Sequence, residues 1–526
     1  MEFVQRLKSN KFLIVFCLIV FIFAFGIRIF YASQKAGFHI DESSSVIFAN
    51  NSLNNIVFSP EERNYLGLGL KQKIYFANGS IKELFSDLNQ LHITTGDSPH
   101  TNLYYVLLRL SLFGLDVPEF SEIVKRGIGL NLIFFTVSFI LMYRILSFLF
   151  KNDFALIPLG LLIAFCNTAS ISSTLFLRPY QMQEMFFLLL TFVCLNFYQD
   201  IRKKQFFNKK NFIVALFTLT FVFLTGYLAP FYVFFLGMGL IIISIKEKEW
   251  KNLVLLFDSC FYAILFACVL YFDFLFGFFS YRATEAVSNV QVFDNLVSSI
   301  KGLGSNLIYF LCYLPTLFLL LFVYLRRVFL KSKFEKNEII PFLIIISFMW
   351  ILLVMFLVPF KVVRYIMPIF PVFSLVYVYA LSGDLKKIER NIYIGCFSLI
   401  FVIFALFPQK MESYDVELPV HQKSFPYSAH LENLFLQASE YTEEFKNNKD
   451  VIFLLSDDLV FHHLYINLDN NQRCRSFNAK YEELPKLEEF YFVSANPNEL
   501  LKNSGYGIEK QMNIGYSLYL VKAIKK

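Results

Sequence analysis

The chain has 526 residues, of which 56% are hydrophobic, 19% aromatic and only 17% charged, and its mean hydropathy is +0.53. An ordinary soluble protein is excluded, because several apolar runs approach or reach the roughly 20 residues that cross a bilayer: Phe12–Ile27, Leu253–Phe272, Leu307–Leu325 and Ile339–Val358. The net charge of +7 does not indicate nucleic-acid binding, because residues 409–526 carry 13 Lys and Arg against 17 Asp and Glu, and the positive excess lies between apolar runs.

The first predicted element is a membrane span at about residues 12–31. Its basic start and apolar continuation are also typical of a signal peptide, but we find no small-residue cleavage site and expect an uncleaved span. Seven of the eight cysteines lie inside apolar runs, and only Cys474 lies in a polar region. This distribution predicts neither a disulfide framework nor a zinc site.

Basic loops orient the other spans, because short loops rich in Lys and Arg stay cytoplasmic. With Arg202–Lys210 and Arg326–Lys333 on that side, residues 1–408 are predicted to form eleven spans. The loops 32–101 and 278–303 and the tail 409–526 are then extracytoplasmic. Asn102–Leu115 is apolar but too short to span comfortably, so we interpret it as a half-membrane or interfacial helix, or as a short span whose partner is not identified.

The tail 409–526 is predicted to be a small α/β domain. Short apolar or alternating segments predict strands, and two further segments predict helices: Asp450–Ser456, Phe490–Ser494 and Tyr516–Val521 for the strands, and Leu431–Phe445 and Asn498–Asn503 for the helices. The fold class is therefore a mainly α-helical polytopic membrane protein with a small C-terminal extracytoplasmic α/β domain.

Two acidic motifs lie in the first outer loop. Asp41 and Glu42 follow the first span by about ten residues, and a carboxylate pair at a membrane surface suits general-base catalysis. They are equally typical of a helix N-terminus, where acidic side chains cap N–H groups and complement the dipole, and both roles are compatible. Asp97 and His100 add a carboxylate and an imidazole ahead of Tyr104, although a capped turn explains that segment as well.

Cationic residues follow at three more places on the same predicted side. Arg178-Pro179-Tyr180 opens a span that carries Glu184 about one turn below, and the others are Tyr281-Arg282 with Lys301, and Lys361 with Arg364-Tyr365. Each Arg could simply reach lipid phosphates at the interface, or could bind the phosphate of a ligand through its planar fork. Asp258 and Asp273 lie in or near a span, where an acid is either functional or paired with a neighbouring helix.

In chain order these motifs resemble the GT-C superfamily of integral membrane glycosyltransferases, in particular the protein mannosyltransferase and aminoarabinose transferase group. The resemblance covers about residues 10–410 and rests on five motifs: Asp41-Glu42, Asp97 followed by Leu103–Tyr105 and Leu112–Gly114, Arg126 at the start of a span, Arg178–Tyr180, and Arg364-Tyr365 followed by Pro368 and Pro371. Thr101-Asn102 stands where that group has Pro-Pro, which leaves the sugar and the acceptor open.

The resemblance implies an inverting glycosyltransferase in a bacterial inner membrane, which moves a sugar from a polyprenyl-phosphate donor to a lipid, glycan or protein acceptor on the extracytoplasmic face. It implies the following site residues: Asp41 as the base or the group that orients the acceptor, Glu42 and Asp97 in support, Arg178, Arg282 and Arg364 at the donor phosphate, and His100, Tyr104 and Tyr180 as further candidates. The sequence requires no metal site, and assistance by a divalent metal ion stays open.

Two other functional classes fit the predicted spans. A polytopic flippase or transporter would also carry outer charges, but it favours functional charge near the bilayer midplane and internal repeats. A non-catalytic membrane subunit of a complex that modifies envelope glycans would keep the spans and would not need the outer carboxylate pair.

Overall fold

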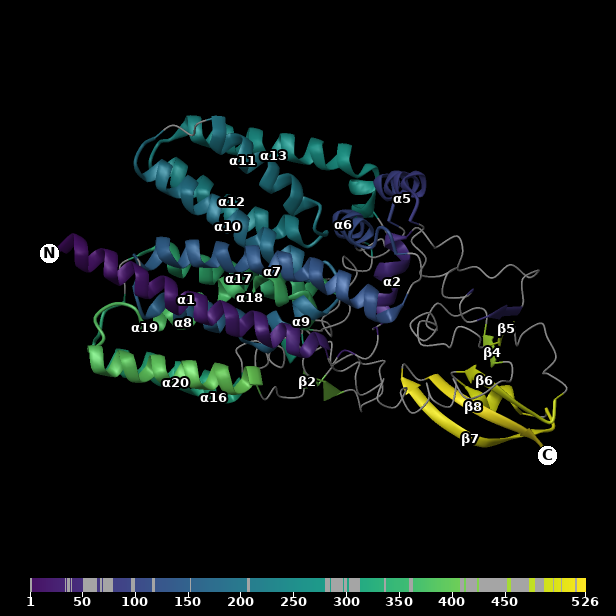
Figure 1. The fold of residues 1–526 in the computed structure, drawn as a ribbon. Coiled ribbons are helices and arrows are strands. Elements are labelled where there is room, and N and C mark those ends of the chain that lie inside the picture. Colours follow the sequence, from purple (N-terminus) through teal and green to yellow (C-terminus); the bar gives the residue numbers. More distant parts are fainter. Residues whose placement is uncertain are drawn as a thin grey trace.

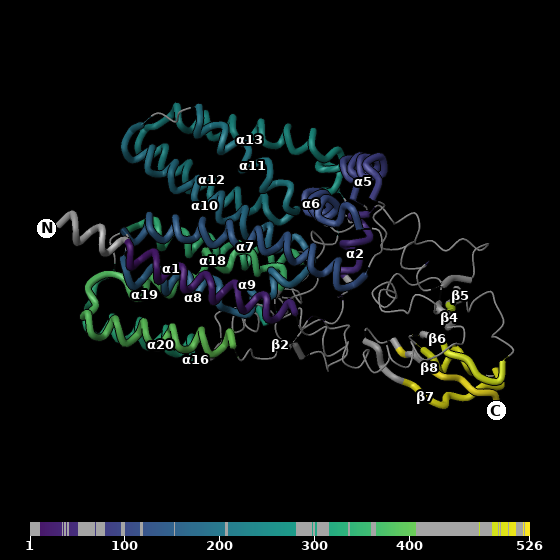
Figure 2. Tube along the Cα trace, in the orientation of Figure 1, coloured from purple at the N-terminus to yellow at the C-terminus, as the bar shows by residue number. Residues whose placement is uncertain are grey.

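The computed structural model contains a helical bundle and a small sheet that lies at one end of it (Figure 1). It describes residues 2–33, 35, 38, 40–50, 64–66, 69, 79–95, 100–115, 119–151, 153–205, 209–279, 284, 297, 300–301, 313–334, 337–358, 363–406, 411–412, 423–424, 452–455, 473–477, 487–494, 496–502, 504–515 and 518–526. The first helix runs from the far end of the bundle towards the end that carries the sheet (Figure 2).

Seven described helices are long and apolar enough to cross a membrane. They are α1 (Glu2–Ser33, spanning from Lys11), α7 (Phe120–Phe150), α10 (Tyr180–Arg202), α12 (Ala229–Lys246), α13 (Trp250–Leu270), α17 (Ile339–Leu357) and α20 (Lys387–Leu406). An eighth span is possible if the bent pair α8 (Leu156–Phe165) and α9 (Thr168–Leu175) counts as one. The protein is therefore an integral membrane protein, as the composition predicts.

Shorter helices complete the bundle. They are α11 (Lys209–Phe223), α16 (Tyr313–Phe329), α18 (Phe370–Phe373), α19 (Leu375–Leu381) and the 3-10 turns η1 (Phe272–Phe274), η2 (Phe276–Phe279), η3 (Val363–Tyr365) and η4 (Met367–Ile369). Each of the eleven expected spans contains helical residues, but some, such as α11 with 15 residues and α16 with 17, are shorter than a span of about 20 residues. The count of eleven therefore stays a prediction.

A buried arginine, Arg28, binds both helices at the break between α8 and α9. The two helices meet at an angle of 55°, and Arg28 of α1 is fully buried beside them. Its guanidinium donates to the carbonyl of Phe165 at the end of α8 (3.1 Å) and to the hydroxyls of Ser170 (2.8 Å) and Thr174 (2.8 Å) on α9. Since the last carbonyls of a helix lack partners within it, Arg28 stabilises the bend that leads the chain towards Arg178.

The basic loops gather at the end of the bundle where the N-terminus lies, which we call the basic end (Figure 1). Three contacts tie these loops together: Arg202 with Glu247 (2.9 Å), Arg390 with Asp153 (3.1 Å), and Asn337 Nδ2 with the carbonyl of Leu149 (3.4 Å). The other end, which we call the sheet end, carries α2 (Ile40–Ala49), α5 (Ile81–Ile93) and α6 (Leu103–Ser111).

Helix α6 covers most of the apolar segment 102–115 and is too short to be a full span. It has nine residues, which at 1.5 Å each is about 14 Å and too short to cross some 30 Å of hydrocarbon. An ion pair between Arg109 Nε and Asp87 Oδ2 (2.8 Å) fastens α6 to α5. Burial raises the pKa of the Asp87 carboxyl, and the hydrogen bond from Arg109 opposes that rise.

The sheet has six strands in the order β1-β5-β4-β6-β8-β7. Their bounds are β1 (Asn64–Leu66), β4 (Ile452–Leu455), β5 (Arg473–Phe477), β6 (Glu489–Ser494), β7 (Tyr506–Gly515) and β8 (Leu518–Lys525). Strand β4 pairs in parallel with β5 and β6, and the other pairs are antiparallel. Residues Met411–Glu412 (β2) and Lys423–Ser424 (β3) form a separate antiparallel pair.

Side-chain alternation explains the inner face of this sheet. Phe490 and Phe492 on β6 and Val521 and Ala523 on β8 are buried, because every second side chain of a strand points to the same face. The three predicted strand segments of the tail are confirmed as β4, β6 and β8, and Asn498–Asn503 overlaps the helix α23 (Pro497–Leu500). The helix predicted at Leu431–Phe445 lies outside the described residues. Strands β1, β5 and β7 were not predicted.

Candidate functional site

The N-terminus of α2 provides the first part of the site. The helix begins at Ile40, and Asp41 and Glu42 lie in its first turn, where negative charge complements the helix dipole. One turn later, Ser45 Oγ donates to the carbonyl oxygen of Asp41 (3.0 Å). The helix-terminus interpretation of the acidic pair is therefore correct, and it leaves a further chemical role compatible.

Asp41 forms an ion pair with Arg364 across the bundle. Asp41 Oδ2 lies 2.8 Å from Arg364 Nη1, and the side chain of Asp41 is 26% exposed whereas that of Arg364 is 9% exposed. Arg364 belongs to η3, far along the chain from α2. The carboxylate is thus the accessible member of the pair, and the guanidinium is held in place beside it.

Arg178 approaches the same turn of α2 from a third segment. It lies after α9 and just before α10, and it is buried. Its Nη1 lies within hydrogen-bond distance of the Asp41 carbonyl (3.4 Å), Ser45 Oγ (3.2 Å) and the hydroxyl of Tyr105 on α6 (3.3 Å). Two of the three predicted phosphate-binding arginines therefore meet at Asp41, although they come from distant parts of the chain.

Glu42 is fully buried, and its contacts join separate segments of the chain. Its Oε1 accepts a hydrogen bond from the backbone N–H of Leu177 (2.9 Å), and its carboxylate forms an ion pair with Lys35 (2.9 Å). Since Leu177 directly precedes Arg178, Glu42 fixes the position of that arginine relative to α2. This geometry gives Glu42 a positioning role next to the more exposed Asp41.

Aromatic side chains line the site on its inner side. The rings of Tyr180 and Tyr365 meet edge to face with centroids 6.4 Å apart, and the guanidinium of Arg364 lies 5.3 Å from the centre of the Tyr365 ring. Tyr180 is buried at the start of α10. Cation–π contact of this kind holds a guanidinium in one orientation.

Two other candidates, Tyr104 and His100, have hydrogen bonds to residues other than Asp41, Arg178 and Arg364. The hydroxyl of Tyr104 donates to Asn131 Oδ1 (3.4 Å) in the core of the bundle, and Asn131 in turn donates to the carbonyls of Thr174 and Phe176 (both 3.0 Å). His100 is half-buried, and its carbonyl accepts a hydrogen bond from Thr95 Oγ1 (3.4 Å). Tyr104 thus supports the segment before Arg178, whereas His100 belongs to the connection between α5 and α6.

Several predicted site residues lie outside the described residues: His39, Asp97, Tyr281, Arg282 and Lys361. Their predicted roles stay predictions. Lys301 and Asp273 are described, and Asp273 Oδ2 accepts a hydrogen bond from Thr94 Oγ1 (3.4 Å). That contact joins the end of α5 to η1 and does not involve Asp41.

The sequence interpretation missed four side chains that the structure brings to the site: Lys35, Ser45, Tyr105 and Tyr365. A signal existed for Ser45, because a residue four positions after Asp41 lies on the same helical face. Tyr105 and Tyr365 stand inside the motifs, directly after Tyr104 and Arg364. Lys35 carried no signal, since its pairing depends on the chain turn between α1 and α2.

Arg126, the motif residue at the start of α7, has a structural role. Its Nη1 donates to the carbonyl of Phe113 (2.6 Å), just after α6. The adjacent Gly114 has a φ of +77°, a conformation that favours glycine because it has no Cβ. Leu112–Gly114 and Arg126 therefore form a turn that ends α6.

The arrangement provides one accessible carboxylate flanked by two guanidinium groups. Such a set can accept a proton from a hydroxyl and can bind an anion through paired N–H donors. In the part of the chain that the structure describes, no group of three or more His, Cys, Asp or Glu side chains is arranged to hold a metal ion.

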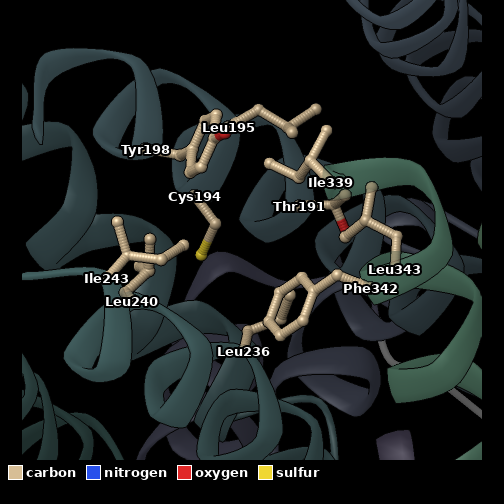
Figure 3. Close-up of a pocket in the computed structure, with 10 residues that line it drawn as sticks. All are labelled: Thr191, Cys194, Leu195, Tyr198, Leu236, Leu240, Ile243, Ile339, Phe342 and Leu343. Carbon is tan, nitrogen blue, oxygen red and sulfur yellow. The ribbon is translucent and has the colours of Figure 1, made fainter. Parts of the chain in front are cut away.

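Two apolar cavities in the described part of the bundle lie away from Asp41. One of about 390 Å³ runs between α10, α11, α12 and α13, and a much smaller one lies between α10, α12 and α17. Figure 3 shows the side chains around the smaller cavity, which are apolar apart from Thr191, Cys194 and Tyr198. Neither of these two cavities is lined by Asp41, Arg178 or Arg364.

Comparisons with protein-family models, with curated proteins and with solved structures find no match for this chain.

Proposed function

We propose that the protein is an inverting glycosyltransferase that takes its sugar from a polyprenyl-phosphate donor and works at the sheet end of the bundle. The observation that carries the proposal is the meeting of Asp41, Arg178 and Arg364 at one turn of α2. These residues come from three of the motifs that resemble the GT-C group, and the Asp41 side chain is accessible.

In the proposed reaction, the hydroxyl or amino group of the acceptor attacks the anomeric carbon from the face opposite the phosphate. The bond between that carbon and the phosphate oxygen breaks, and the polyprenyl phosphate leaves with the electron pair. Asp41 accepts the proton that the acceptor loses, or orients the acceptor by a hydrogen bond. One displacement inverts the anomeric configuration.

The two arginines supply the electrostatic part of the proposal. Negative charge grows on the phosphate as it leaves, and fixed cations next to that position stabilise the transition state. Arg364 pairs with the Asp41 side chain and Arg178 lies at the Asp41 carbonyl oxygen, and planar guanidinium groups match paired phosphate oxygens. A phosphate joined to a membrane lipid is expected near the ends of the spans; Arg178 stands just before α10, and Arg364 lies in η3, which follows α17.

The contact between Glu42 and Leu177 fixes the position of Arg178 relative to Asp41. The hydrogen bond from Leu177 N–H to Glu42 Oε1 (2.9 Å) connects the segment of Arg178 to the helix of Asp41. A displacement of about 1 Å between reacting groups can cost a large factor in rate. We therefore assign Glu42 to positioning and Asp41 to the contact with the acceptor.

The experiment is a comparison of cells that lack the protein with cells that produce it. Mass spectrometry of lipids and envelope glycans should show one glycosyl unit missing without the protein and restored by the unaltered chain. Asp41→Asn keeps the shape and removes the charge, so it should not restore the unit, because a general base contributes about 10²–10⁴-fold.

Asp200→Asn is the matched control, because Asp200 lies at the basic end and its side chain accepts one hydrogen bond among the described residues, from Asn211 Nδ2 (3.2 Å). It should restore the glycosyl unit fully. Unchanged glycans in the deletion cells, or full restoration by Asp41→Asn, would contradict the proposal.

A further inference from the structure

Helix α13 presents an unusually open apolar face. Only 17% of its span is buried, the lowest share among the seven candidate spans of the described chain. Large exposed side chains recur along it with the spacing of one helix face: Val254, Phe257, Phe261, Leu265 and Val269. In a membrane protein such a stripe faces lipid or another membrane helix.

Asp258 lies in this face. It is exposed, it stands between Phe257 and Phe261, and it makes no hydrogen bond or ion pair within the part of the chain that the structure describes. At 1.5 Å per residue it is about 12 Å from the start of α13. Ionisable residues in spans almost always face a protein interior and pair there, so a lipid-facing Asp258 indicates that a single copy is incomplete.

Within α13, the one basic residue that could pair with Asp258 is Lys251. Lys251 is exposed and stands seven residues earlier on nearly the same face, about 10 Å closer to the basic end. A lysine at a helix end extends its ammonium group towards water, which moves it away from Asp258. The Asp side chain is too short to follow, so a cation at its own depth has to come from outside this helix.

Arg144 of α7 is a cation of the required kind. It continues an exposed stripe of Ile133, Val137 and Ile140, and it too makes no hydrogen bond or ion pair among the described residues. It lies about 9 Å from the end of α7 at Phe150. The end of α7 and the start of α13 are both at the basic end, as the contacts of Leu149 and Glu247 place them. Asp258 and Arg144 therefore lie at similar depth.

We propose that two copies of this chain associate in the membrane through Asp258 on α13 of one copy and Arg144 on α7 of the other. The charges are opposite, the depths are similar, and each residue has exposed apolar side chains on its own helix face that would pack in the same contact. Pairing removes the carboxylate from the lipid, which is the driving feature, since Arg144 alone could reach the interface. This inference stands apart from the proposed glycosyltransferase activity.

Cross-linking between two co-produced, differently tagged copies tests the contact. Ile140 and Phe261 are exposed next to Arg144 and Asp258, and each is about 15 Å from the basic end of its helix. Oxidation in native membranes should join Ile140→Cys of one copy to Phe261→Cys of the other. Val269→Cys on the same face is the depth-mismatched control and should not join to Ile140→Cys, and chains with only one new cysteine give the baseline of the native cysteines.

Charge exchange then tests the pair itself. Asp258→Arg and Arg144→Asp should each reduce the cross-linked fraction at least about tenfold, and the chain with both changes should regain it, because the pair is rebuilt with its signs reversed. If a reversed charge hinders insertion, Asp258→Asn tests the same contact. It should reduce the cross-linked fraction while the chain still elutes as a folded species in detergent. Equal cross-linking in the single variants, no recovery in the double variant, or an Asp258-dependent complex with a different protein in place of a second copy would overturn the proposal.

Discussion

Asp41 Oδ2 and Arg364 Nη1 lie 2.8 Å apart, although Asp41 belongs to the first helix after the first span and Arg364 to a 3-10 turn near the end of the transmembrane part. The pair joins these two distant segments at the sheet end of the bundle, and the Asp41 carboxylate stays partly accessible. Its two members have different tasks in the proposed reaction, so exchanging each of them should have a different kinetic effect.

Arg364→Lys should weaken use of the lipid donor. Lysine keeps the positive charge but loses the planar fork that matches two phosphate oxygens, and a hydrogen bond to a charged group is worth about 1.5–3 kcal/mol, or roughly tenfold to a hundredfold in affinity. The measurement is the dependence of transfer on donor concentration, with purified protein and a lipid extract as the donor source. Transfer from nucleotide-sugars without any lipid carrier would contradict the donor assignment.

Gly127→Ala on α7 should disturb the site through Leu177. A Cβ at Gly127 would lie 2.6 Å from Leu177 Cδ2, whereas a Cβ at Gly129 on the same helix meets nothing within 4 Å. Overpacking a core costs about 1–3 kcal/mol, while alanine in a helix gains about 1 kcal/mol over glycine. We expect Gly127→Ala to lower both the unfolding midpoint and the activity, and Gly129→Ala to keep or raise the midpoint. Equal behaviour of the two variants would refute the close packing of Leu177.

Part of the site could be predicted from the sequence, because span ends are recognisable. Asp41, Arg178 and Arg364 each stand at the edge of an apolar run, and the alternation of basic loops assigns these edges to one side. Their mutual contacts could not be predicted, because they depend on how α2, η3 and the segment after α9 pack. The role of Glu42 depended on Lys35 and Leu177, which no local pattern connects to it.

The sheet, too, could be predicted only in part from the sequence. Strands β4, β6 and β8 have apolar or alternating residues, which local pattern detects. Strand β1 has only the three residues Asn64–Leu66, and it becomes a strand because β5 offers it a partner. Three residues are too few to show an alternation, so only tertiary structure reveals this strand.

Arg28→Lys should destabilise the bundle strongly. Arg28 is fully buried and donates hydrogen bonds to both halves of the α8–α9 pair, and its guanidinium lies 3.8 Å from the centre of the Phe135 ring. Lysine cannot reproduce this set of directions, and each hydrogen bond lost from a charged group costs about 1.5–3 kcal/mol. The measurement is the thermal unfolding midpoint in one detergent.

Arg202→Lys is the control for Arg28→Lys, because Arg202 is exposed and its pairs with Glu247 and Glu338 lie at the surface. Surface ion pairs contribute about 0–1 kcal/mol, so this variant should unfold within a degree or two of the unaltered protein. Similar losses for both variants would mean that Arg28 does not hold the broken span.

Thiol labelling tests the sidedness that the basic loops predict. Lys204 and Glu488 are both exposed, the first at the basic end and the second beside the sheet. In a Cys474→Ser background, a membrane-impermeant maleimide added outside intact cells should label Glu488→Cys and leave Lys204→Cys unlabelled until the cells are opened. The reverse pattern would turn the whole topology around and would place the acidic pair in the cytoplasm.

Strand β1 links two segments of the chain that truncation experiments would treat as separate. It belongs to the loop that follows the helix of Asp41, but its hydrogen-bond partner β5 lies in the tail. Removing the tail would therefore expose the backbone edge of β1, and exposed strand edges pair with other chains. A shortened protein that aggregates or loses activity would report a broken sheet, so the tail has to be examined by substitutions within β5 and not by deletion.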